Sequence, residues 1–151
     1  DKVIFIFFIL LLIIDETDNT DYFLYKYNLS KKNQKRIKNV HDFYKEKIKS
    51  NTFTEKNMNK IFYYEGKEAV IDILRFKLLN SKLNNKKLLE LISFYSDMKV
   101  PILPIKADFL MSKFDISEGK ILGSKIKMIE KKWVENNFQI SQKQVENIIN
   151  S

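Results

Sequence analysis

The sequence has no cysteine and only one histidine among its 151 residues. Without cysteine, disulfide bridges and thiolate chemistry are excluded. A single imidazole leaves too little material for a zinc site or a histidine-based catalytic triad. We therefore interpret His41 as a residue on the surface of a helix rather than as a catalyst.

Proline and glycine are also scarce, with two and three residues respectively, and both prolines and two of the glycines fall within residues 101–138. Elsewhere, apolar residues recur at helical spacing between short polar joints, with no alternating strand series and no internal repeat. The sequence therefore predicts an all-α fold, an irregular array of helices without a sheet. We expect three parts: an apolar helix and polar linker (1–21), a helical body (22–98) and C-terminal tail helices (99–151).

Acidic residues are fewer than basic ones: the sequence has 19 Asp and Glu and 27 Lys and Arg, which gives a net charge of +8. Such a balance favours an anionic partner, either nucleic acid or a membrane surface. All the basic residues except Arg36 and Arg75 are lysine, and Asn and Ile are abundant as well. An AT-rich genome produces that composition without selection for binding, so the charge alone does not establish a partner.

Charge is absent altogether from residues 3–14, an unbroken apolar run. A membrane-spanning helix needs about twenty such residues, and the flanks lack the basic start and small-residue cleavage site of a signal peptide. A buried strand, a membrane-inserted segment and a buried helix are the alternatives, and we favour the helix. Apolar side chains left exposed on such a helix favour association, so we expect the isolated chain to self-associate through Phe5, Phe8 and Leu12.

Polar residues with helix-capping side chains mark the starts of several predicted helices. Ser30 precedes a basic helix over residues 31–49, which carries Ile37, Val40, Tyr44 and Ile48 on one face. Further starts follow Thr54, Asn85 and Ser141, and Gly66 marks the end of one helix and the start of the next.

The tail contains an amphipathic helix whose expected N-cap is Ser117, with Glu118 in the first turn. Gly119 and Gly123 near its start predict the close approach of another backbone or a ligand. An ordinary surface helix with a solvated lysine face is the alternative interpretation. The apolar stripe consists of Leu122, Ile126, Ile129 and Trp133, and Lys120, Lys127 and Lys131 lie nearly opposite.

The tail resembles the C-terminal end of bacterial-type tRNA nucleotidyltransferases, the CCA-adding enzymes, and of their relatives the bacterial poly(A) polymerases. That pattern has a proline, an Asp-Leu pair, spaced glycines, a Leu-rich helix and a late Trp. Asp115 stands where the family has glycine, and Asp tolerates a left-handed backbone better than most residues. The resemblance covers residues 22–150, and residues 3–14 more weakly. The matching tail residues are Leu103, Pro104, Asp108, Ile116, Gly119, Leu122, Gly123, Ile126 and Trp133.

The resemblance implies a body and tail that grip tRNA or another RNA. Start signals such as Leu29-Ser30-Lys31-Lys32 resemble the opening of a body helix in the same family. The residues expected to contact RNA are Lys31, Lys32, Lys35, Arg36, Gly119, Lys120, Gly123, Lys127 and Lys131.

The catalytic head of that family is not recognisable in this sequence. Its nucleotidyl transfer needs a Gly-Ser turn and an Asp-x-Asp pair to bind two magnesium ions. The sole Gly-Ser, at Gly123, lies in the lysine-rich helix, and the acidic residues 15–21 are interpreted as a solvated linker. We therefore assign no catalytic residue, metal or cofactor to this chain. Mg²⁺ and CTP or ATP would belong to the absent head, and nucleotide addition would need that head in trans or would not occur.

The sequence thus predicts a cytoplasmic RNA-binding module related to tRNA 3′-end processing, without nucleotidyltransferase motifs of its own. One alternative is a membrane-associated protein, with residues 3–14 inserted and the basic residues 26–49 on anionic lipid. The other is a folded remnant of the enzyme with no independent activity.

Overall fold

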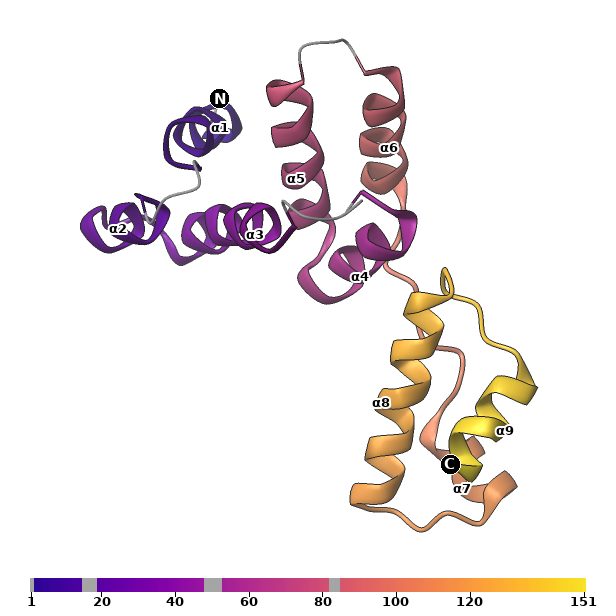
Figure 1. The fold of residues 1–151 in the computed structure, drawn as a ribbon. Helices are drawn as coiled ribbons and strands as arrows, with labels where there is room; N and C mark the ends of the chain where they lie inside the picture. Colours follow the sequence, from indigo (N-terminus) through magenta and orange to yellow (C-terminus); the bar gives the residue numbers. More distant parts are fainter. Residues whose placement is uncertain (1, 15–18, 48–52, 82–84) are drawn as a thin grey trace.

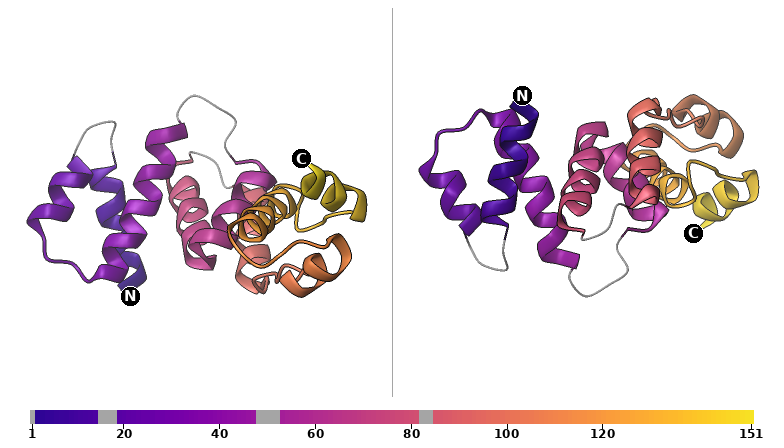
Figure 2. Two further views of the ribbon diagram at one scale, coloured as in Figure 1. Left: turned by 90° about the horizontal axis from the view of Figure 1, so that it is seen from below. Right: turned by 90° about the horizontal axis from the view of Figure 1, so that it is seen from above.

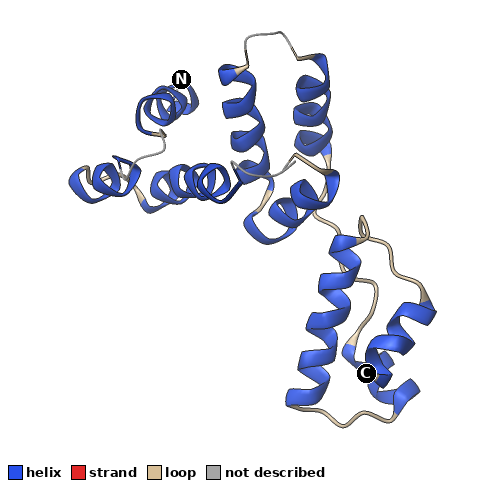
Figure 3. Ribbon diagram, in the orientation of Figure 1, coloured by secondary structure: helices blue, strands red, loops and turns tan. Residues whose placement is uncertain are grey.

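The computed structural model describes residues 2–14, 19–47, 53–81 and 85–151, and these ranges contain helices and no strand (Figure 3). The all-α prediction is therefore confirmed. The helices, labelled in Figure 1, are α1 (Lys2–Ile13), α2 (Asn19–Lys26), α3 (Lys31–Lys47), α4 (Glu55–Glu65), α5 (Lys67–Asn80), α6 (Lys86–Asp97), α7 (Ala107–Phe114), α8 (Lys120–Glu135) and α9 (Gln142–Asn150).

The predicted caps at Thr54, Asn85 and Ser141 each precede a helix in the structure. The side chains of Thr54 and Asn85 accept hydrogen bonds from backbone N–H groups three residues later, at 3.3 and 3.4 Å. Ser141 and Gln144 form a reciprocal capping box at the start of α9. Gly66 ends α4 and begins α5 with φ 93°, a value that side-chain-bearing residues rarely adopt. These starts and the break at Gly66 are confirmed.

The start of α8 differs from the prediction at Ser117. The helix begins at Lys120, and Gly119 occupies the N-cap position with φ 147° and no side-chain cap. Asp115 ends α7 in the left-handed conformation, with φ 52° and ψ 40°. Asp115 therefore adopts the left-handed backbone that its residue type was expected to tolerate. Because the backbone of Gly119 is not helical, with φ 147° and ψ −160°, the helix begins only after it, and Glu118 lies outside its first turn.

The helix α7 was not predicted. It has only eight residues and follows a segment that contains Pro101 and Pro104, and Lys106 at its N-cap position makes no side-chain capping bond. A short helix without a cap and next to prolines leaves little periodic signal.

Two hydrophobic cores lie in different parts of the molecule (Figure 1). The body core is formed by α1, α3, α4, α5 and α6, and its fully buried residues include Leu10, Ile37, Phe62 and Leu74. The tail core is formed by α7, α8 and α9 around Leu110, Leu122, Ile129 and Val145.

The joint between body and tail is a contact between α4 and α8. Tyr63 of α4 packs edge-on against Trp133, with ring centroids 5.5 Å apart, and its hydroxyl donates to Glu130 Oε1 at 2.8 Å. Burial, followed by that bond and the charge of Glu130, raises the pKa of Tyr63 to about 12. Asn59 Nδ2 also donates to Asn137 Oδ1 at 3.1 Å. Trp133 is buried, as predicted for the apolar stripe.

The apolar run near the N-terminus is a helix, as favoured, and the strand alternative is wrong. Its inward stripe, Ile6, Ile9, Leu10 and Ile13, joins the body core. The predicted polar linker extended too far, because Asn19–Lys26 form α2; residues 15–18 lie outside the described residues. Among the described helices, none has the length and apolar character needed to cross a membrane.

His41 is buried, so its interpretation as a surface residue is wrong. It lies in α3 four residues after Ile37 and next to Val40, both of which are fully buried. Because α3 packs against α1, α2 and α5, its buried sector is wider than a single stripe.

Candidate nucleic-acid interface

A row of lysines runs along the outer face of α8. Lys120, Lys127 and Lys131 are exposed, while Leu122, Ile129 and Trp133 on the opposite face are buried. Their spacing of seven and four residues keeps the three lysines within about 40° of one another around the helix, over roughly 16 Å of its length. The predicted exposure of Lys127 and Lys131 is confirmed.

The carboxylates of α8 are engaged by α4. Glu130 accepts the hydrogen bond from Tyr63, and Glu135 lies 2.7 Å from Lys60 Nζ and 3.6 Å from Lys56 Nζ. The hydrogen bond from Lys60 holds the pKa of Glu135 below its usual value; burial opposes this shift, and the charges of Lys60, Lys56 and Lys131 reinforce it. Glu135 is therefore ionised at neutral pH and surrounded by lysines.

Lys56 and Lys60 extend the basic surface from α8 onto α4, and sequence reasoning missed them. They lie four residues apart, which places them on one face of α4, but only the tertiary contact shows that this face meets α8. The side chain of Lys56 is 53% exposed. We call Lys56, Lys60, Lys120, Lys127 and Lys131 the lysine face.

The two glycines of the tail helix lie beside this face and are exposed. A Cβ added at Gly119 or Gly123 would meet no atom within 4 Å, so neither glycine is needed for close packing within the described chain. Gly119 is required by its φ of 147°, whereas Gly123 has no such backbone requirement. The expected approach of another backbone of this chain is therefore not observed.

The basic residues predicted on α3 are arranged differently. Lys32 pairs with Glu68 at 2.9 Å and Lys35 with Glu65 at 3.2 Å. Each acid belongs to α4 or α5, so these exposed pairs join α3 to its neighbours. Lys31 is exposed at the start of α3.

Arg36 makes the tightest of these contacts. Its Nε and Nη2 atoms donate to the two carboxylate oxygens of Asp72 at 2.6 and 2.7 Å. The bond to Asp72 raises the pKa of Arg36, which burial opposes. The guanidinium of Arg36 is therefore engaged by Asp72 within the protein.

The two predicted basic groups do not form one surface. The helices α3 and α8 lie apart in Figure 1 and in both views of Figure 2. The structure thus brings Gly119, Lys120, Gly123, Lys127 and Lys131 together on α8, and keeps the α3 residues on another part of the molecule.

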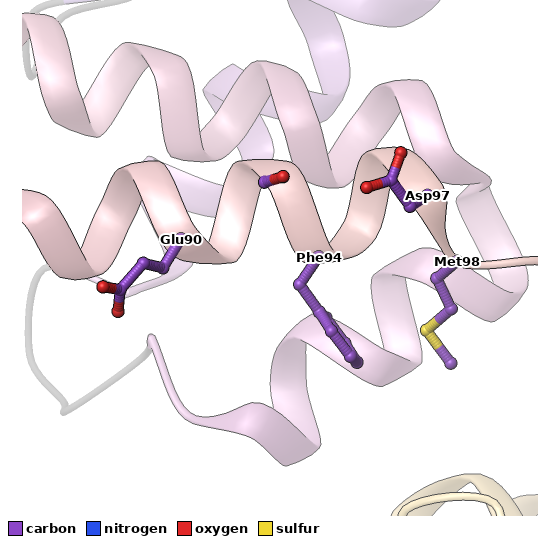
Figure 4. Close-up of a pocket in the computed structure, with 5 residues that line it drawn as sticks. Glu90, Phe94, Asp97 and Met98 are labelled. Carbon is purple, nitrogen blue, oxygen red and sulfur yellow. The ribbon is translucent and has the colours of Figure 1, made fainter.

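An open pocket of about 530 Å³ lies along α6, where Phe94 and Met98 project from the helix (Figure 4). Glu90 and Asp97 also line it, together with Ser93. Its carboxylates make it unsuited to phosphate. Within the part of the chain that the structure describes, no group of three or more His, Asp or Glu side chains could hold a metal ion.

Comparison with known proteins adds no relative: no family model, no curated protein and no solved structure matches this chain.

Proposed function

We propose that this chain is an RNA-binding helical module that contacts the phosphates of a structured RNA, such as tRNA, through the lysine face. One observation carries the proposal. Lys120, Lys127 and Lys131 point to solvent on α8, while the carboxylates Glu130 and Glu135 of the same helix are engaged by α4. The surface that α8 presents is therefore basic, even though the helix also carries acidic residues.

Lysine ammonium groups bind phosphates as point charges, without the bidentate geometry of arginine. Phosphates of one strand recur every 3.4 Å or so along a duplex axis. A lysine row of roughly 16 Å can therefore meet several phosphates of one strand. Contacts of this kind position a protein on RNA by shape and read little base sequence.

The N-terminus of α8 adds to the same surface. Its first backbone N–H groups and the positive end of the helix dipole lie at Gly119 and Lys120, and they favour an anion there. Gly123 presents no side chain on the exposed surface one turn further along. Lys31, Lys32 and Lys35 form a secondary basic group, whereas Arg36 contributes to the fold.

The resemblance of the tail to CCA-adding enzymes and poly(A) polymerases supports the choice of tRNA as the RNA. In this proposal the chain binds RNA in the cytoplasm, and nucleotide addition requires a separate catalytic head. We expect the purified chain alone to add no nucleotides to tRNA.

The test measures tRNA binding by fluorescence anisotropy across a range of salt concentrations. Neutralising one phosphate contributes roughly 0.7 to 0.9 to the slope of log K against log salt. Changing Lys120, Lys127 and Lys131 to Gln should therefore weaken binding and flatten that slope by about 2 to 3. The matched control changes Lys86, Lys87 and Lys99, three exposed lysines on and beside α6, to Gln.

The triple variant on α8 should keep its fold, because its three side chains lie opposite the buried stripe. Circular dichroism checks this directly. If the α8 variant and the α6 control bind as tightly as each other, the lysine face is only a solvated surface. CTP-dependent extension of tRNA by the chain alone would overturn the assignment of a non-catalytic module.

A further inference from the structure

A second surface lies on α1, at the end of the molecule away from the tail (Figure 1). Beside its buried stripe, α1 exposes Phe5, Phe8 and Leu12, which are 60%, 63% and 79% accessible. At 100° per residue these three side chains lie within about 60° of one another. They form one apolar stripe on a helix whose residues 3–13 include no charged side chain.

The size of this stripe indicates what can cover it. Large apolar side chains bury roughly 200 Å² each when fully covered. At the observed exposures, Phe5, Phe8 and Leu12 together offer roughly 400 Å² per molecule. Two copies would then bury about 800 Å² from these side chains alone, which is below the range of about 1,200–2,000 Å² for stable interfaces. The stripe therefore fits a weak association.

The pattern of the stripe suits a second copy of the same helix. In an antiparallel pair related by a two-fold axis, Phe8 lies near the axis and meets Phe8 of the other copy. Phe5 then lies near Leu12 of the other copy, so one patch is sufficient for both sides. The absence of charge also matches the core of a protein interface, where charged residues are depleted.

The charged residues that follow α1 argue against a lipid surface as the partner that covers the stripe. Helices that lie on membranes carry Lys and Arg, which are attracted to anionic lipids. The sequence that follows α1 instead supplies acidic residues, Asp15, Glu16, Asp18 and Asp21. The residues that follow α1 in the sequence therefore do not supply the attraction to anionic lipid that such helices use.

We propose that α1 is the interface of a weak symmetric dimer of this chain, formed by antiparallel packing of the Phe5, Phe8 and Leu12 stripe on itself. This proposal is independent of the RNA-binding function. Because α1 and α8 lie at different ends of the molecule (Figure 1), the dimer leaves both lysine faces open.

The test uses sedimentation equilibrium of the full chain over a range of concentrations. We expect reversible dimerisation in the micromolar range. Phe8→Glu and Phe8→Lys each place two like charges at the two-fold axis, so each variant alone should dissociate at least about tenfold more readily, as expected at the centre of an interface. An equimolar mixture of the two variants should dimerise again, because every mixed pair brings opposite charges together.

A second measurement covers the case in which a charged variant fails to fold. Because the chain has no cysteine, Phe8→Cys introduces a single thiol, which should form a symmetric disulfide on mild oxidation. Tyr25→Cys is the control, since Tyr25 is 90% exposed but lies on α2. The proposal fails if the parent chain stays monomeric at all concentrations, or if Phe8→Cys cross-links no faster than Tyr25→Cys. It also fails if the mixture of charged variants does not dimerise, or if the parent is monomeric and floats with vesicles of phosphatidylcholine and phosphatidylglycerol.

Discussion

The ion pair between Arg36 and Asp72 should dominate the stability of the α3–α5 contact. Only 14% of the Arg36 side chain and 1% of the Asp72 side chain are exposed, and two short hydrogen bonds join them. Changing Arg36 to Met keeps most of the apolar stem but leaves Asp72 buried without its cation. Breaking a buried pair in this way costs about 3–5 kcal/mol. That is a large part of the roughly 5–15 kcal/mol by which a domain is stable.

Urea denaturation followed by circular dichroism measures this loss. With a slope of about 2 kcal/mol per molar urea, the midpoint should fall by roughly 1.5–2.5 M. The double variant Arg36→Met with Asp72→Val should recover most of the loss, because it removes the buried charge together with its partner.

The exposed pair between Lys32 and Glu68 is the matched control. It joins α3 to α5 at 2.9 Å, but its side chains are 67% and 59% exposed. Lys32→Met should therefore cost less than about 1 kcal/mol. If Arg36→Met destabilises the chain no more than Lys32→Met, burial does not govern the strength of these pairs and the reasoning is refuted.

The remaining predictions concern α8. Glu135→Gln should destabilise the chain at pH 7 but much less at pH 3. Because the pKa of Glu135 is lowered in the folded chain, its carboxylate stabilises the fold above the unfolded pKa of 4.5, and this stabilisation is lost as the pH falls through the folded pKa. Urea denaturation at several pH values measures the difference. Gly123→Ala should stabilise the chain by about 1 kcal/mol, because the added methyl meets no atom and alanine favours the helix. Gly119→Ala should instead destabilise it by about 1–3 kcal/mol, because φ is 147° there; equal effects at the two glycines would contradict this account.

Local signals in the sequence predicted much of the fold. Thr54, Asn85 and Ser141 identify helix starts because capping depends on residues only three positions apart. The stripe that ends at Trp133 likewise determines which face of α8 is exposed.

The features that sequence reasoning missed depend on contacts between distant segments. Arg36 and Asp72 are 36 positions apart in the sequence, so the sequence gives no sign that Arg36 is paired. Only the packing of α3 against α5 brings the two side chains together. Lys56 and Lys60 join the lysine face only because α4 packs on α8. His41 is buried because helices from both sides cover α3.

The division into two cores has a consequence for how the chain opens. Among the described residues, the body core gathers fifteen buried apolar side chains, whereas the tail core gathers four. Local unfolding requires least free energy where few apolar contacts are broken. We therefore expect amides of α7 and α9 to exchange with solvent through openings that leave α3 and α5 folded. The lysines of α8 lie on this less protected unit, so any anion that binds them only in the folded tail also slows that exchange.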